Sequence, residues 1–201
     1  MKFDYYRKRR IIVPYSKLTK EIKRIAKQLD HDYKDKHPVI VGLMNSSFMF
    51  LAELMLNMKC DVEIEFVKVF TYSKLREEKI DAQRIQQAFD WERLKNRNVI
   101  IVDELIDTGD SFQFMVKELK RRSKPKSIAT CAMIEKDWPR PYFKQKVDYV
   151  GVKVPNLWIT GHGMAYKYKY RNLKDVVALS DAEKGFNKYE ARNKKVHKKA
   201  N

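Results

Sequence analysis

The stretch Asn98–Ser111 constrains the fold of this chain more than any other; it reads Asn-Val-Ile-Ile-Val-Asp-Glu-Leu-Ile-Asp-Thr-Gly-Asp-Ser. Val99–Val102 is a continuous run of β-branched residues, which is typical of a strand buried on both faces of a parallel sheet. The run stops at two adjacent carboxylates, Asp103 and Glu104, where a buried strand does not place charge without reason. The segment therefore predicts a central strand with a functional site at its carboxyl end.

A turn-forming cluster, Asp107–Ser111, follows the acid pair and precedes a helical pattern. A strand, a tight polar loop and a helix N-terminus together form an anion cradle, because free backbone N–H groups and the positive end of the helix dipole face one point. Gly109 allows close backbone approach, and Thr108 and Ser111 add hydroxyls. The paired acids suit a ligand with a vicinal diol beside its phosphate. The alternative is a plain strand-to-helix turn capped by Asp107 or Ser111.

Further strands and helices are predicted on both sides of this segment. Ser16 is expected to cap an amphipathic helix whose apolar positions run from Leu18 to Leu29. A second buried strand, Pro38–Met44, turns through Asn45-Ser46-Ser47 into another helix, which repeats the same architecture. The other predicted strands are Ile11–Val13, Val62–Phe70, Ser127–Ile134 (ending in Glu135-Lys136), Val147–Val152 and Asp175–Leu179. The pattern favours an α/β fold with a parallel sheet of about five strands.

Composition narrows the function classes. The chain is 44% hydrophobic and has no apolar run as long as a membrane span, so we expect one domain over 1–183 and no membrane partner. Cys60 and Cys131 match no metal spacing, which favours a reduced, cytoplasmic chain. Residues 184–201 form a basic tail, expected to be a frayed helix or disordered. The net charge of +17 permits nucleic-acid binding, although a solvated basic surface is the commoner explanation.

Two stretches resemble a known family. The strand, acid pair and Asp-Thr-Gly turn of Asn98–Ser111 resemble the 5-phosphoribosyl-1-pyrophosphate (PRPP) loop of the phosphoribosyltransferases. Lys146–Leu173, with Trp158, Gly161-x-Gly163 and Tyr170-Arg171-Asn172-Leu173, is similar in spacing to the base-binding hood of the hypoxanthine/guanine type. The resemblance spans about Leu18 to Leu179. It implies the type I phosphoribosyltransferase fold, a parallel sheet flanked by helices, with a small hood from the N-terminal segment and about 155–175.

The resemblance implies a reaction and a set of roles. The 5-phosphoribosyl group of PRPP would pass to a 6-oxopurine, giving the nucleoside monophosphate and pyrophosphate in purine salvage. Asp103 and Glu104 match the acids that hold the ribose diol, directly or through Mg²⁺. Asp107 matches the general base or proton relay near purine N7. The 5′-phosphate would be held by Asp107, Thr108, Gly109, Asp110 and Ser111.

Other residues match the family's positions that bind the base and the pyrophosphate. Lys136 matches the lysine that binds the exocyclic oxygen and selects 6-oxopurines over adenine. Trp158 matches the aromatic that stacks on the base, and the backbone of Ile159 the group that meets the base edge. Pyrophosphate would be held by Arg171 and by the loop residues Asn45 and Ser46. The resemblance also implies a homodimer or homotetramer and a flexible loop over the active site, within Thr71–Arg97.

Three positions depart from the family pattern and keep alternatives open. Asn45-Ser46-Ser47 stands where the family has Lys-Gly, and Met164-Ala165 stands where it has Leu-Asp, an aspartate that ligates a second Mg²⁺. Asp110 adds a negative charge beside the phosphate cradle. The alternatives are a catalytically weakened regulator of this fold that binds RNA or DNA through its basic surface, or an enzyme for xanthine or another base such as a pyrimidine.

Overall fold

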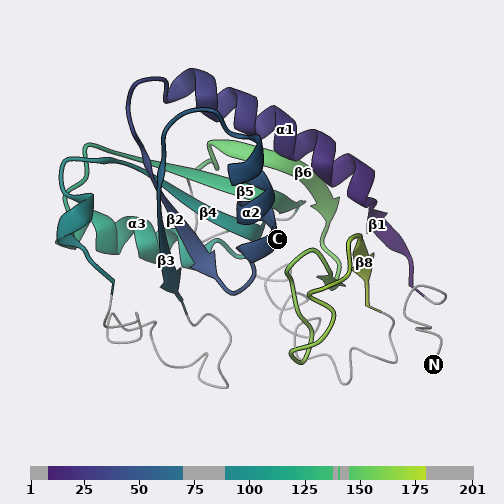
Figure 1. Ribbon diagram of the computed structural model, residues 1–201. Coiled ribbons are helices and arrows are strands. Elements are labelled where there is room, and N and C mark those ends of the chain that lie inside the picture. The colour runs from purple at the N-terminus through teal and green to yellow at the C-terminus, as the bar shows by residue number, and fades with distance from the viewer. Residues whose placement is uncertain (1–8, 70–88, 138–139, 141–144, 180–201) are drawn as a thin grey trace, which may run out of the picture.

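The computed structural model describes residues 9–69, 89–137, 140 and 145–179. Its centre is a five-stranded, fully parallel sheet in the order β3-β2-β4-β5-β6 (Figure 1). The strands are β2 (Val39–Met44), β3 (Glu63–Lys68), β4 (Asn98–Ile106), β5 (Ser127–Asp137) and β6 (Tyr149–Pro155). The predicted α/β class and the parallel sheet are confirmed.

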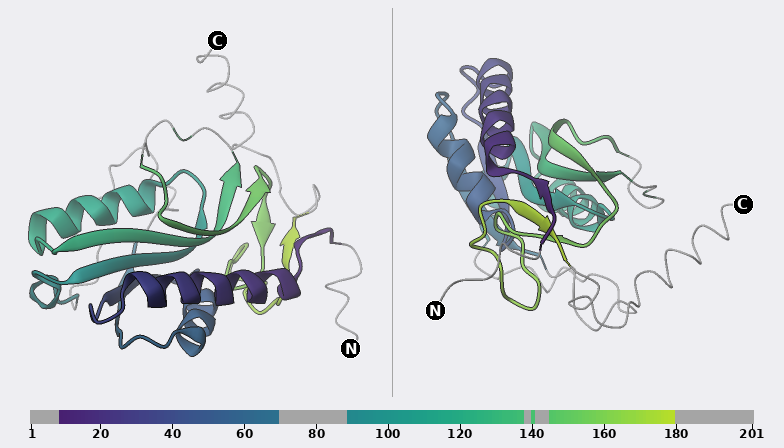
Figure 2. Two further views of the ribbon diagram at one scale, coloured as in Figure 1. Left: turned by 90° about the horizontal axis from the view of Figure 1, so that it is seen from above. Right: turned by 90° about the vertical axis from the view of Figure 1, so that its right-hand side faces the viewer.

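Helices cover both faces of this sheet, as Figure 2 shows from two further sides. Helices α1 (Tyr15–Asp32) and α2 (Phe48–Asn57) lie on one face, and α3 (Asp110–Arg122) lies on the other. Along β4, Ile100 and Val102 belong to the core under α1 and α2, whereas Val99 and Ile101 belong to the core under α3. Alternate side chains of a strand point to opposite faces, so a strand covered on both sides must be apolar at every position. This explains the unbroken apolar run.

Two local predictions were wrong. Helix α1 begins at Tyr15 with Pro14 as its N-cap, and the Pro14 carbonyl accepts bonds from the amides of the first turn, so Ser16 does not cap it. Strand β5 continues to Asp137, so Glu135 and Lys136 lie inside it and pair with β6 rather than following the strand end. Propensity and charge gave no sign of this extension, because pairing with β6 supplies the missing hydrogen bonds.

A second, three-stranded sheet lies against the carboxyl ends of the central strands. It contains β1 (Ile11–Val13), β8 (Val176–Ala178) and β7 (Ile159–Thr160), in the order β1-β8-β7 and antiparallel throughout. The amide of Tyr15, at the start of α1, donates to Asp175 Oδ1 at 2.7 Å and joins the two parts. The small sheet therefore faces the carboxyl end of β4, and the strand continues through the acid pair to Ile106 instead of stopping there.

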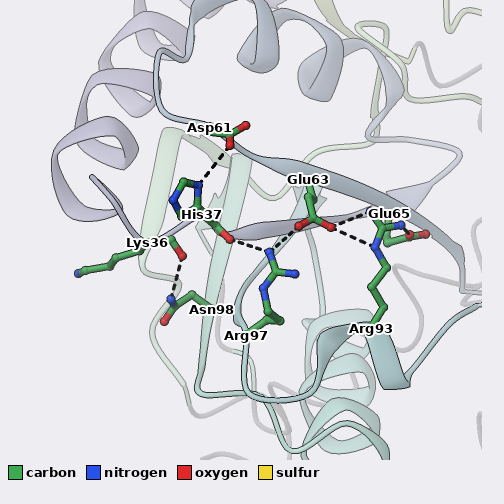
Figure 3. A network of polar contacts seen from close by, with 8 residues as sticks. All are labelled: Lys36, His37, Asp61, Glu63, Glu65, Arg93, Arg97 and Asn98. Atoms are coloured by element: carbon green, nitrogen blue, oxygen red, sulfur yellow. Dashed lines mark hydrogen bonds and ion pairs between the residues drawn. The ribbon is translucent and has the colours of Figure 1, made fainter.

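At the amino end of the central sheet, an ion-pair network holds the segment before β4, which includes the 3-10 helix η2 (Glu92–Leu94) (Figure 3). Arg93 and Arg97 both bond to Glu63, with Arg93 Nη2 and Arg97 Nη2 at 2.7 and 2.6 Å, and Arg93 also pairs with Glu65. Bonds from Arg97 and Arg93 lower the pKa of Glu63. Exposed pairs of this kind contribute little stability individually. The network lies at the sheet edge opposite the acid pair.

Some predicted segments fall outside the described residues. Residues 70–88, most of the predicted active-site loop, residues 1–8 of the N-terminal segment and the tail 184–201 are among them. Within the described residues, no helix combines the length and the apolarity that crossing a membrane requires.

Candidate active site

Asp103 is held at the point where β4 meets the loop that follows β2. The hydroxyl of Ser46 and the amide of Glu104 both donate to Asp103 Oδ1, at 2.7 Å each. Burial raises the pKa of Asp103 to about 7, and these hydrogen bonds act in the opposite direction because they favour the carboxylate. The bond from Ser46 joins the predicted pyrophosphate loop to the predicted ribose acids.

Glu104 is fully buried and pairs with a histidine of the small sheet. His162 Nδ1 lies 2.9 Å from Glu104 Oε1. Burial raises the pKa of Glu104 to about 7, although the bond to His162 opposes it. Burial lowers the pKa of His162, but the bond to Glu104 and the Glu104 charge outweigh it, so the net pKa lies above its ordinary value. His162 is not among the predicted site residues; its only signal in the sequence is its place between two glycines.

Asp107 and Lys136 form an ion pair at the ends of two neighbouring strands. Lys136 Nζ lies 3.0 Å from Asp107 Oδ2, and their side chains are 8% and 12% exposed. The register explains this contact: Ile106 of β4 pairs with Glu135 of β5, so the next residue of each strand lies alongside. The predicted proton-handling acid and the predicted base-selecting lysine thus contact each other directly.

The loop after β4 leads into α3 as a backbone cradle. Gly109, with φ at 82°, is the N-cap of α3, and the amide of Asp110, the first residue of the helix, donates to the Thr108 hydroxyl at 3.4 Å. Such a left-handed conformation is open to glycine at little cost. The plain alternative, with Asp107 or Ser111 as the cap, is therefore wrong. Amides at the start of α3 and the hydroxyls of Thr108 and Ser111 remain suited to a phosphate.

The loop after β2 packs against the hairpin between β7 and β8. The Met44–Asn45 peptide of this loop is cis. At Gly163 of the hairpin, an added Cβ would lie 2.2 Å from the carbonyl oxygen of Ser46, so only glycine permits this approach. Arg171 Nη1 donates to the Gly163 carbonyl at 2.6 Å. The structure thus gathers the predicted pyrophosphate residues around one hairpin.

The predicted base-stacking residue follows β6. Trp158 lies edge-on to Tyr166, with ring centroids 6.3 Å apart, and its carbonyl accepts a bond from the Leu179 amide at 2.9 Å. Ile159 is buried in β7. Val154 of β6 pairs with Lys136 of β5, so the chain runs from the lysine's neighbour to Trp158 within four residues. Trp158 and Ile159 thus follow directly from the strand beside Lys136.

The acidic residues bear on magnesium binding. Glu104 Oε2 is a buried oxygen without a hydrogen-bond partner among the described residues, and such an oxygen can coordinate a hard cation or accept a hydrogen bond from a hydroxyl. The same part of the chain holds no cluster of three or more His, Cys, Asp or Glu side chains suited to a metal. The free oxygen of Glu104 therefore fits an ion that is held mainly by substrate oxygens.

Comparisons with known proteins show which family the chain is similar to. Residues 12–167 match the model of the phosphoribosyl transferase domain. The hypoxanthine-guanine phosphoribosyltransferase of Streptococcus pyogenes serotype M3 is 30% identical over 172 residues, which cover 86% of this chain and 93% of that protein.

Solved structures extend the likeness to the fold. A hypoxanthine-guanine phosphoribosyltransferase from Bacillus anthracis aligns with a TM-score of 0.76 at 26% identity, over 85% of this chain and 98% of that one. A hypoxanthine phosphoribosyltransferase from Trypanosoma cruzi, a K68R mutant in complex with the product IMP, aligns with a TM-score of 0.74 at 26% identity, over 88% and 95%.

Proposed function

The chain belongs to the purine phosphoribosyltransferase family, and from that premise we propose that it transfers the 5-phosphoribosyl group of PRPP to hypoxanthine or guanine. The products are the nucleoside monophosphate and pyrophosphate, as in purine salvage in the cytoplasm. The observation that carries this proposal is the Asp107–Lys136 pair, which stands beside the acids of β4 and the N-terminus of α3. The small sheet serves as the hood over this site.

In the proposed reaction, purine N9 forms a bond to C1 of the ribose while the bond from C1 to the pyrophosphate oxygen breaks. Asp107 accepts or relays the proton at purine N7, which keeps electron density available at N9. Lys136 donates to the exocyclic oxygen of the base. An ammonium group has three N–H donors, so Lys136 can bind this oxygen while it retains its 3.0 Å bond to Asp107.

The sugar phosphate is held by groups on three segments. The 5′-phosphate binds at the backbone cradle from Asp107 to Ser111, where the α3 dipole favours negative charge. Asp103 and Glu104 accept bonds from the ribose hydroxyls. A magnesium ion bound to PRPP near these two acids would neutralise the leaving pyrophosphate. Arg171 and the amides of the loop at Asn45 and Ser46 orient that group, and Asn45 does not supply the charge of the family's lysine.

The test is an assay with PRPP, Mg²⁺ and each nucleobase in turn, run with the wild type and with Asp107→Asn. We expect nucleotide from hypoxanthine and guanine, and a loss of about 10²–10⁴-fold in kcat for Asp107→Asn because the proton acceptor is gone. The matched control is Asp61→Asn, which removes the same charge at an 85% exposed side chain at the amino end of the sheet. We expect this control to behave as the wild type.

Each result has a distinct meaning. No product with any base would overturn the proposed reaction and favour the nucleic-acid-binding regulator. Product from xanthine or a pyrimidine alone would change the base assigned to the enzyme and leave the assigned class of reaction unchanged. An Asp107→Asn variant as active as the wild type would remove the role given to Asp107 alone.

A further inference from the structure

His162 is a polar side chain enclosed within the fold. It is 0% exposed and lies between Gly161 and Gly163 in the hairpin of the small sheet. All three residues have positive φ, at 99°, 46° and 93°. The hairpin is held by backbone bonds from His162 to Leu173, at 2.7 Å, and from Gly163 to Arg171, at 2.9 Å. These bonds fix the backbone that carries the imidazole.

The ring of His162 stands between two carboxylates from different elements. Its Nδ1 lies 2.9 Å from Oε1 of Glu104, at the end of β4, and its Nε2 lies 3.5 Å from Oε1 of Glu53, on α2. Glu53 also accepts a bond at 3.0 Å from the hydroxyl of Tyr15, at the start of α1. A single line of polar contacts therefore runs from α1 through α2 and the small sheet to the ribose acids.

This arrangement costs folding free energy, which argues for a role beyond packing. Enclosing an imidazole and a carboxylate away from water carries a desolvation penalty that a well-packed apolar pair would not incur. The contact also assigns the two oxygens of Glu104 different roles: Oε1 is held by His162, whereas Oε2 is buried with no hydrogen-bond partner in the described part of the chain. Oε1 is therefore anchored, and Oε2 is enclosed without a hydrogen-bond partner among the described residues, so a hydroxyl brought to it would satisfy it.

We propose that His162 is a positioning residue, which holds Glu104 so that its second oxygen meets a ribose hydroxyl of PRPP. This inference rests on the proposed function. It makes the small sheet part of the sugar site as well as its cover. The same hairpin touches the carbonyl of Ser46 through Gly163 and the guanidinium of Arg171. Ribose and pyrophosphate are therefore bound by one connected unit.

Two substitutions separate a positioning role from a packing role. In His162→Asn the amide nitrogen stands near the place of Nδ1 and can still donate to Glu104. In His162→Gln it reaches the place of Nε2, toward Glu53, and leaves Glu104 unheld. Asparagine is also tolerated at positive φ. A hydrogen bond to a charged group corresponds to a change of about 10- to 150-fold in a binding constant.

The measurement is steady-state kinetics on the full chain, with PRPP and hypoxanthine varied separately and thermal melting of each variant recorded. We expect His162→Gln to raise KM for PRPP by about tenfold or more, with KM for hypoxanthine changed less than about twofold, and His162→Asn to restore most of the loss. In a Glu104→Gln background, His162→Gln should add little, because residues that act through one contact are not additive.

The outcomes are decisive in each direction. A wild type without activity refutes the proposed function itself. An active wild type with equal KM for PRPP in the Gln and Asn variants, or with full additivity in the Glu104→Gln background, refutes the positioning role alone. If the His162 variants do not fold, Glu53→Gln replaces them, since its side chain is 22% exposed and outside the hairpin. Glu53 is the charge that faces the other ring nitrogen, Nε2, so its removal loosens the ring that holds Glu104, and we expect a raised KM for PRPP. An unchanged KM for PRPP in that variant would then overturn the inference.

Discussion

Replacing Lys136 by alanine tests whether the ion pair in the site is also part of the protein's stability. Lys136 Nζ and Asp107 Oδ2 are 3.0 Å apart, and both side chains are about nine-tenths enclosed. Removing one partner of a buried pair costs about 3–5 kcal/mol, because the desolvation of the remaining charge is no longer offset by that pair. Asp107 keeps 12% of its surface exposed, so water can recover part of this loss. We expect Lys136→Ala to lower the free energy of unfolding by about 2–3 kcal/mol.

The matched control is Lys153→Ala, on the neighbouring strand β6. Lys153 Nζ lies 3.6 Å from Glu135 Oε2, but its side chain is 71% exposed, so its pair contributes about 0–1 kcal/mol. Urea unfolding of the substrate-free proteins gives both values, and in thermal melts the difference corresponds to about 2–4 °C for each kcal/mol. Equal stability of the two variants, or a stabilised Lys136→Ala, would refute the reasoning. We further expect Lys136→Ala to raise KM for hypoxanthine by about tenfold or more.

Two further predictions concern other parts of the structure. Gly163→Ala places a Cβ 2.2 Å from the Ser46 carbonyl oxygen at a φ of 93°. We therefore expect a destabilisation of about 1–3 kcal/mol and a higher KM for PRPP. Unchanged thermal melting and an unchanged KM would contradict the close contact. Burial, with a hydrogen bond to Asp30, raises the pKa of Cys60 to about 11. Because the thiolate is the reactive form, the rate of Cys60 alkylation by iodoacetamide should still rise between about pH 8 and pH 10, whereas a plateau near pH 9 would contradict it.

Local sequence determined much of the framework. The unbroken run Val99–Val102 identified a strand covered on both faces, because only such a strand must be apolar at every position. The apolar spacing from Leu18 to Leu29 identified α1, and all of its predicted inward positions are buried. The turn cluster Asp107–Ser111 indicated that a helix follows the acid pair, and α3 begins within that cluster, at Asp110. Each of these signals acts within a few residues, so no partner elsewhere in the chain was needed to interpret it.

Contacts between distant segments were decided by the tertiary structure alone. Lys136 was expected at the end of its strand; pairing with β6 continues β5 through it to Asp137, and its contact with Asp107 depends on the neighbouring strand. His162 and Glu104 are 58 residues apart, and no spacing or residue type in either segment indicates that they meet. The acid pair is visible in the sequence, but its burial and raised pKa values depend on what the small sheet and α2 place around it. Local sequence determined where the strands and helices form. The packing of the two sheets determined which polar groups face one another, because desolvation and pairing arise only when separate segments exclude water together.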